Sequence, residues 1–127
     1  MAVDSSALVA VVLGEPDAES FLAKLQSTYT VLSAANLVEA AIVVEARQGL
    51  DAARDLELLV EGVVDEIVPV DPSHAAAAVE AWRRYGRARH PAGLNFGDCF
   101  AYGLARLRGL PLLFKGDDFS STDVAVA

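Results

Sequence analysis

Residues 92–119, which read AGLNFGDCFAYGLARLRGLPLLFKGDDF, contain the pattern that decides the fold. Asn95 is a good N-cap, so a helix is expected to begin beside it and to carry Asp98 in its first turn. Gly109 and Pro111 end that helix, and the apolar segment 112–114 that follows is typical of a buried strand. The strand is followed at once by Lys115, Gly116, Asp117 and Asp118. In open α/β sheets ligands bind beside the carboxyl ends of the strands, so we expect a site where this strand ends.

The rest of the chain repeats this alternation of strands and helices. Strands are predicted at 1–4, 29–32 and 66–70, and helices at 5–13, from Pro16, at 35–48, 50–64 and 72–87. Alternation of this kind predicts an α/β protein, a three-layer α/β/α sandwich with a central, mostly parallel sheet. Residues 1–127 are predicted to form a single domain. Helix 35–48 is apolar nearly all round and is expected to be buried, and Trp82 and Tyr85 are expected in the core.

Composition excludes several classes of protein. The 127 residues are 54% hydrophobic with one cysteine, which excludes a disulfide framework and a multi-cysteine metal site. Cys99 is expected to be a small buried apolar residue. No apolar run is long enough to cross a membrane, and the N-terminus does not resemble a signal peptide, so a cytoplasmic protein is expected.

Charge is distributed unevenly along the chain. The net charge is −8, yet residues 83–115 contain seven basic side chains and a single acidic one. Such asymmetry predicts a local basic surface that could bind a polyanion. The candidate substrate-binding residues are Arg83, Arg84, Arg87, Arg89 and Lys115. The alternative is that these arginines only solvate one helix.

Acidic residues stand where the predicted elements begin or end. Asp4 follows the first strand, Asp98 opens a helix, and Asp117 and Asp118 follow the last strand. Glu39 is a lone acid on an apolar helix face, where a charge needs a partner. We expect the fold to gather these acids around Mg²⁺ or Mn²⁺, which prefer oxygen ligands and can activate water against a phosphodiester.

Simpler roles exist for two of these acids. Asp98 could be only a helix-capping residue, although at a helix N-terminus it is expected to stay ionised and so suit a metal. Glu39 could lie at a helix margin, where it would reach water or an arginine. No Gly-rich phosphate loop, histidine pair or Ser-His-Asp set offers another chemistry.

Four short motifs, in order along the whole chain, resemble one protein family. They are Val-Asp-Ser-Ser-Ala-Leu at 3–8, a Glu six residues after Ser33, Gly-Asp-Cys at 97–99, and Leu-Leu-Phe-Lys-Gly-Asp-Asp-Phe at 112–119. This pattern resembles the PIN domain, and specifically the VapC toxins of type II toxin–antitoxin systems. The resemblance implies a homodimeric endoribonuclease that depends on Mg²⁺ or Mn²⁺ and cleaves structured RNA such as tRNA or rRNA. It also implies a VapB-type antitoxin that occludes the site.

The resemblance also assigns roles to individual residues. Asp4 and Asp98 match the principal metal ligands, Glu39 matches the third catalytic acid, and Ser6 matches a hydroxyl residue that supports Asp4. The fourth acid is open, because both Asp117 and Asp118 precede Phe119. Asp118 is favoured, followed by Asp117, with Asp123 the weakest candidate.

Two other classes of protein remain as alternatives. A phosphoacceptor receiver domain has a similar length and a lysine at a late strand end, but its acceptor would have to be Asp71, which is better explained as a helix cap before Pro72. A PIN-like module that binds RNA or protein without catalysis is the other alternative, although every acidic position is filled.

Overall fold

A four-stranded parallel sheet lies at the centre of the computed structural model, which describes residues 1–127. The strands are β1 (Ala2–Val3), β2 (Val31–Ser33), β3 (Glu66–Val68) and β4 (Leu112–Leu113), in the order β3-β2-β1-β4. All three pairings are parallel, so every strand ends at the same edge of the sheet. The parallel sheet predicted from the alternation of elements is therefore confirmed.

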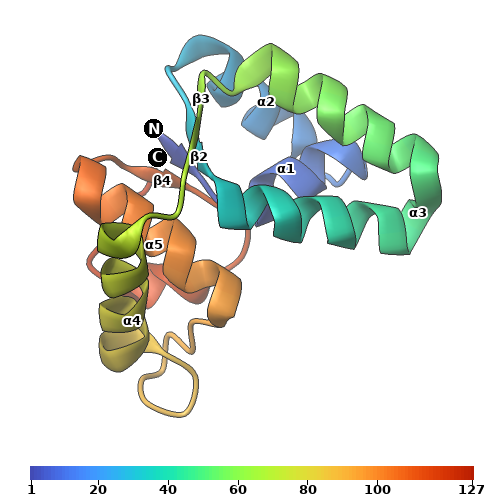
Figure 1. Cartoon of the computed structure of the whole chain (residues 1–127). Helices are drawn as coiled ribbons and strands as arrows, with labels where there is room; N and C mark the ends of the chain where they lie inside the picture. The colour runs from blue at the N-terminus through green and yellow to red at the C-terminus, as the bar shows by residue number, and fades with distance from the viewer.

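Helices cover both faces of this sheet (Figure 1). Their bounds are α1 Ser5–Val12, α2 Ala18–Ser27, α3 Ala34–Val63, α4 Pro72–Tyr85 and α5 Phe96–Arg108, with a short 3₁₀ helix, η1, at Asp118–Ser121. Figure 1 shows α1, α2 and α3 on one side of the sheet and α4 and α5 on the other. The three-layer α/β/α sandwich is confirmed.

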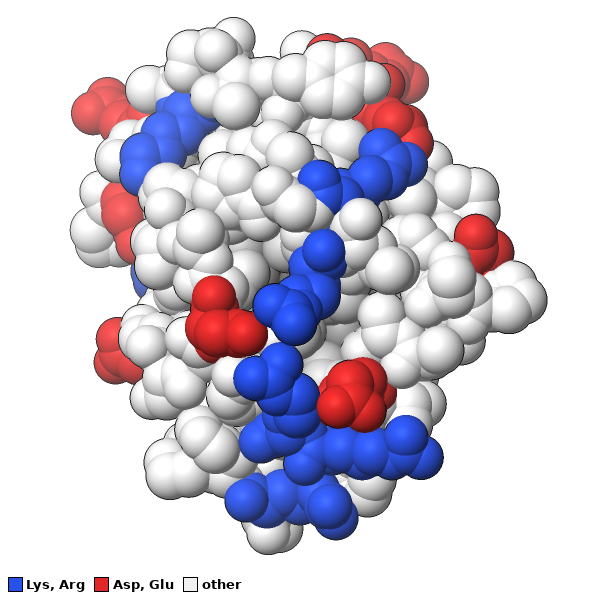
Figure 2. Space-filling view, turned by 90° about the vertical axis from the view of Figure 1, so that its left-hand side faces the viewer, with Lys and Arg blue, Asp and Glu red and all other residues white.

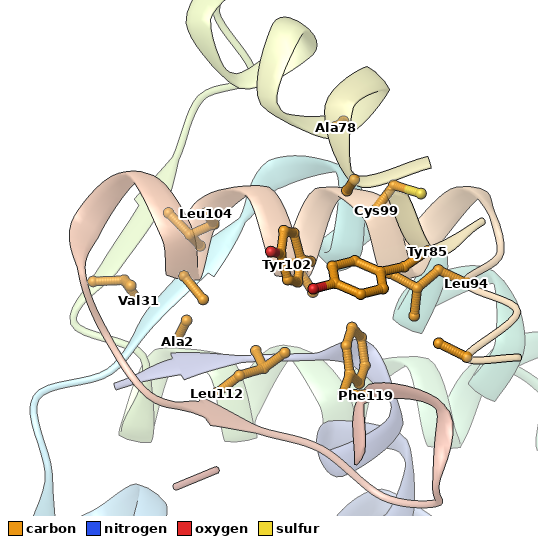
Figure 3. Close-up of a cluster of buried hydrophobic side chains, with 14 of the residues drawn as sticks. Ala2, Val31, Ala78, Tyr85, Leu94, Cys99, Tyr102, Leu104, Leu112 and Phe119 are labelled. Carbon is orange, nitrogen blue, oxygen red and sulfur yellow. The ribbon is translucent and has the colours of Figure 1, made fainter. Parts of the chain in front are cut away.

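Successive strand residues enter opposite cores, because side chains alternate across a strand. Ala2, Val31 and Leu112 belong to a cluster with α4 and α5, and their neighbours Val3, Leu32 and Leu113 belong to a cluster with α1, α2 and α3. Figure 3 shows the first cluster, in which Tyr85 and Tyr102 meet edge to face with ring centroids 5.5 Å apart. Two-residue strands are therefore enough to anchor both layers.

Gly49 divides the long helix α3. Its φ of 79° and ψ of −167° are not helical, and only glycine adopts that region readily. The chain therefore turns there between two helical segments, as predicted for 35–48 and 50–64. The prediction that the first segment is buried on all sides is wrong. Ala40 and Val44 are buried, but Val38 and Ile42 are 58% and 64% exposed, because the helix packs on α1 and the sheet with one side only.

The helix α4 is slightly shorter than predicted. It ends at Tyr85, since Gly86 is extended, and strand β3 ends at Val68 just before Pro69. Tyr85 is buried as expected, but Trp82 is 46% exposed, so its predicted core position is wrong. The reason is that Ala78 and Ala81 pack against α5, where Gly103 leaves little room for large side chains. No helix is both long enough and apolar enough to cross a membrane.

Candidate active site

The carboxyl ends of the strands open into an acidic cleft of about 320 Å³. It lies where α1, α3 and α5 begin, so residues far apart in the chain meet there. The cleft is lined by Asp4, Ser5, Ser6, Val9, Glu15, Glu39, Val43, Arg47, Asn95, Asp98, Lys115, Asp118 and Phe119. The structure thus brings four of the predicted acids to one place.

Asp4 is the most deeply buried of these acids. It caps α1, because its Oδ2 accepts a hydrogen bond from the backbone N–H of Ser6 at 3.0 Å. Its other oxygen, Oδ1, is buried and has no hydrogen-bond partner. Burial raises the pKa of Asp4 from 3.8 to about 6, against the lowering effect of its hydrogen bonds with Ser6. An unpartnered buried carboxylate oxygen is costly, and a cation is one way to satisfy it.

Asp98 is both a helix cap and a cleft residue. Its Oδ2 accepts from the backbone N–H of Asn95 at 3.0 Å, and the Asn95 side chain accepts from the Asp98 N–H at 2.9 Å, which completes a capping box. Burial, together with the nearby charges of Asp4, Asp118 and Glu39, raises the pKa of Asp98 to about 7. These effects outweigh the lowering effect of the bond from Asn95, so Asp98 holds a proton more readily than an ordinary helix-capping aspartate.

Glu39 is held in place by two side chains that the sequence analysis missed. Ser5 Oγ donates a hydrogen bond to Glu39 Oε1, and Asn36 Nδ2 donates to the same oxygen at 3.3 Å. Asn36 Nδ2 also donates to the carbonyl of Gly97 at 3.0 Å, which ties α3 to the first turn of α5. The carboxylate lies directly against Gly97, where an added Cβ would be 2.1 Å from Oε2. The partners of Glu39 are neutral donors, and no arginine pairs with it.

The candidates for the fourth acid occupy different places. Asp118 lines the cleft, and its charge contributes to the raised pKa of Asp98. Asp117 is exposed and does not line the cleft. Asp123 lies elsewhere, because its carboxylate accepts from the Tyr102 hydroxyl and pairs with Arg84 at 3.5 Å. The geometry therefore favours Asp118 and removes Asp123 as a candidate.

Ser6 joins two sides of the cleft. Its backbone N–H binds Asp4, and its Oγ accepts a hydrogen bond from the backbone N–H of Lys115 at 2.9 Å. This places the end of β4 beside the start of α1. The Lys115 side chain is already engaged, because its Nζ pairs with Glu15 and, at 3.2 Å, with Asp17.

Of the predicted basic residues, Lys115 lines the cleft, whereas the four arginines lie on another part of the surface. Figure 2 shows Lys and Arg side chains running down the face on which α4 and α5 lie. None of Arg83, Arg84, Arg87 and Arg89 lines the acidic cleft. Arg84 pairs with Asp123, and the Arg89 guanidinium lies over the Trp82 ring at 4.6 Å. The cleft has a different free cation, Arg47 on α3, which the sequence analysis did not single out.

The acidic side chains do not form a complete metal site in the arrangement that the structure shows. No three His, Cys, Asp or Glu side chains are grouped closely enough to hold a metal ion as they stand. The donor set is nevertheless one of oxygen atoms only, which suits Mg²⁺ or Mn²⁺. Cys99 is not part of it, since it is buried, and its burial raises the pKa of its thiol to about 11.

An apolar face adjoins the cleft at the start of α5. Phe96 is 82% exposed and stands in a groove with Val38, Ile42 and Phe100, which continues to the edge of the cleft at Glu39. A second apolar groove shares Phe96 and Phe100 and extends over α4 to Trp82.

Comparison with known proteins identifies the family. The model of the PIN domain matches residues 1–125. The ribonuclease VapC30 of Mycobacterium tuberculosis is 48% identical over 126 residues, which cover 98% of this chain and 96% of the relative. The ribonuclease VapC of Mycolicibacterium smegmatis is also 48% identical, over 98% of both chains. The chain therefore belongs to the PIN domain family, among the VapC ribonucleases.

Solved structures share the fold at lower identity. VapC20 of M. tuberculosis aligns with a TM-score of 0.80 at 20% identity, over 99% of this chain and 97% of that one. FitAcB of Neisseria gonorrhoeae aligns with a TM-score of 0.69 at 22% identity, over 98% and 94% of the two chains. The receiver-domain alternative is excluded by this membership. Asp71, which that alternative required, is an exposed cap that accepts from the His74 N–H at 3.0 Å.

Proposed function

We propose that this protein is a metal-dependent endoribonuclease that hydrolyses RNA in the acidic cleft. The observation that carries the proposal is the convergence of Asp4, Glu39, Asp98 and Asp118 at the carboxyl edge of the sheet. The PIN domain match and the VapC ribonuclease relatives at 48% identity support it.

The residues of the cleft fit Mg²⁺ or Mn²⁺. Asp4 and Asp98 would hold the ion, because Asp4 Oδ1 lacks any partner and burial raises the pKa of both carboxyls, a shift that a bound cation would oppose. Since Mg²⁺ usually keeps several waters, it does not need three side chains in direct contact. The bound ion would lower the pKa of an attacking water and would place positive charge near the phosphate.

The side chains of this protein would then position water and substrate. Ser5 and Asn36 hold Glu39 through Oε1, which leaves Oε2 to accept a hydrogen bond, and then a proton, from the attacking water. The water oxygen would bond to phosphorus as one phosphorus–oxygen bond of the RNA backbone breaks. Asp118, on η1, adds negative charge that helps to retain the cation.

The test is cleavage of tRNA and rRNA by purified protein, with Mg²⁺, with Mn²⁺ and with a chelator. Discrete fragments are expected with either metal, and none with chelator or with Asp98→Asn. Asp55→Asn is the matched control, because Asp55 is exposed on α3 and does not line the cleft. Absence of cleavage by folded protein would favour the non-catalytic binding module. Cleavage that persists in Asp98→Asn would contradict the assigned role of Asp98.

The proposal extends to substrate and partners. VapC20, which shares the fold, is described as a Sarcin-Ricin loop cleaving toxin, and this supports a structured RNA such as rRNA or tRNA as the substrate. A Klebsiella pneumoniae structure with a TM-score of 0.74, at 16% identity over 99% of this chain and 95% of that one, is a toxin–antitoxin complex. It supports a VapB-type antitoxin as the partner of this chain. The proposed place of action is the cytoplasm.

A second copy of the chain is the proposed occupant of the apolar face. Val38, Ile42 and Phe96 are exposed there, and Glu39 at the edge is the only charged residue of the groove. A two-fold contact brings the same surface of both copies together, so a face that is apolar apart from Glu39 at its edge can meet itself with little repulsion. Such a homodimer would place each copy beside the other's cleft.

A further inference from the structure

Arg47 is the only basic side chain of the cleft that is not paired with an acid. The only basic residues lining the cleft are Arg47 and Lys115, beside five acids. Lys115 is bound to Glu15 and Asp17. The Arg47 side chain is exposed and forms no ion pair or hydrogen bond within the chain. It is thus the one cleft cation whose charge is not already compensated.

The position of Arg47 on α3 explains why it faces the cleft. Glu39, Val43 and Arg47 follow each other at intervals of four residues, which places them on one side of a helix, and all three line the cleft. At 1.5 Å of rise per residue, Arg47 lies about 12 Å along the helix axis from Glu39. It is therefore at the lip of the cleft and outside the acid cluster.

A polyanion that enters this cleft needs such a group. The acids repel RNA phosphates, and a metal at Asp4 and Asp98 would compensate charge only at its own position. A guanidinium binds a phosphate through two parallel hydrogen bonds, and a contact of this kind positions the backbone without reading the bases. The arginine line on α4 cannot replace it, because none of Arg83, Arg84, Arg87 and Arg89 lines the cleft.

We infer that Arg47 binds a backbone phosphate of the RNA substrate, at a nucleotide away from the one that is cleaved. This inference rests on the proposed function and adds to it a specific anchor for the substrate backbone. Arg47 holds the strand across the cleft, while the acids act on another phosphate. Its contribution to affinity is independent of base sequence. The rate at which the bound complex cleaves RNA does not depend on it.

The test compares Arg47→Gln with Arg54→Gln, a matched control on the same helix. Arg54 is also exposed and without an ion pair, but it does not line the cleft. KM and kcat are measured on a short oligoribonucleotide with Mg²⁺. Binding of the same fluorescent oligonucleotide is measured from 50 to about 200 mM salt with the Asp98→Asn variant, which is expected not to cleave it.

Arg47→Gln is expected to raise KM and the dissociation constant about tenfold, with kcat at saturation unchanged. It is also expected to lower the slope of log affinity against log salt by about one, the signature of one lost phosphate contact. Arg47→Lys should recover part of the affinity, and Arg54→Gln should match the wild type.

The outcomes separate this inference from the function on which it rests. If the wild type cleaves RNA while Arg47→Gln and Arg54→Gln have the same KM and salt slope, this inference is overturned and the nuclease stands. A loss in kcat alone, with the salt slope unchanged, also overturns it. A wild type that neither binds nor cleaves RNA overturns both.

Discussion

Replacing Gly97 with alanine should displace Glu39, the proposed proton acceptor, without unfolding the protein. A Cβ at residue 97 would lie 2.1 Å from Glu39 Oε2 and 2.5 Å from Oε1 and Cδ, whereas ordinary contacts begin at 3.4 Å. The carboxylate, at the end of a flexible side chain, therefore has to retreat by about 1.3 Å, the difference between 3.4 and 2.1 Å. That movement pulls Oε1 away from Ser5 and Asn36, the donors that fix it.

The size of the effect follows from this displacement. A misplacement of about 1 Å can cost an enzyme roughly 100-fold in rate, or about 2.7 kcal/mol of barrier. The helix itself should tolerate the change, because Gly97 has no left-handed φ and alanine is favoured over glycine in helices by up to about 1 kcal/mol. Activity and stability are therefore expected to separate in Gly97→Ala.

The assay is kcat/KM for RNA cleavage, with thermal unfolding measured on the same samples. Gly62→Ala is the matched control, since Gly62 lies in α3 with nothing within 4 Å of an added Cβ. If Gly97 acts through Glu39, then Gly97→Ala should cost almost nothing further in a Glu39→Ala background. Wild-type cleavage by Gly97→Ala, or an equal loss in both backgrounds, would refute this reasoning.

Three further predictions concern the cleft and the apolar face. The pKa values of Asp4 and Asp98 are raised to about 6 and about 7, so the folded protein binds protons at these carboxyls more tightly than the unfolded chain does. The stability that this protonation provides is lost as pH rises through those values. Metal-free protein should therefore melt at a lower temperature at pH 8 than at pH 5. The change in unfolding free energy from Asp98 is on the order of 2–3 kcal/mol, and Asp98→Asn should flatten the melting profile; a profile that rises with pH would contradict this. Asp118→Asn should lower cleavage by at least about tenfold, whereas Asp117→Asn should cleave normally, and the reverse result would assign Asp117 instead. Phe96→Ser should shift the protein towards monomers in sedimentation velocity, with Leu50→Ser as control, since Leu50 is 76% exposed just after Gly49 and outside the apolar groove. Unchanged association in both variants would remove the apolar face as the dimer contact.

The sequence was most informative where a residue of the cleft lies at the end of an element. Asp4 and Asp98 could be found because strand ends and helix caps have local signals, and parallel strands bring those ends to one edge. Glu39 could be found because a charge on an apolar helix face is conspicuous. These three positions depend on local chemistry and on the order of the elements, both of which can be read from one chain.

The features that were missed depend on how the layers pack. Trp82 has the helical spacing of a core residue, but the close approach of α4 to Gly103 of α5 leaves room for alanines only. Arg47 looks like any solvated arginine until α3 is placed beside the cleft. Asn36 and Ser5 are ordinary polar residues near helix starts. Their role appears only when the fold brings both side chains to Glu39 and brings Asn36 to the carbonyl of Gly97.

The cleft draws on both helical layers and on distant parts of the chain. Asp4 follows β1, and Asp118 follows β4, which pairs with β1 in the sheet. A ribosome makes the chain from Asp4 towards Asp118, so the four acids cannot meet until β4 has been synthesised and has paired. With the proposed function, a nascent chain is harmless to the ribosome that produces it until Asp118 has been synthesised and β4 has paired with β1.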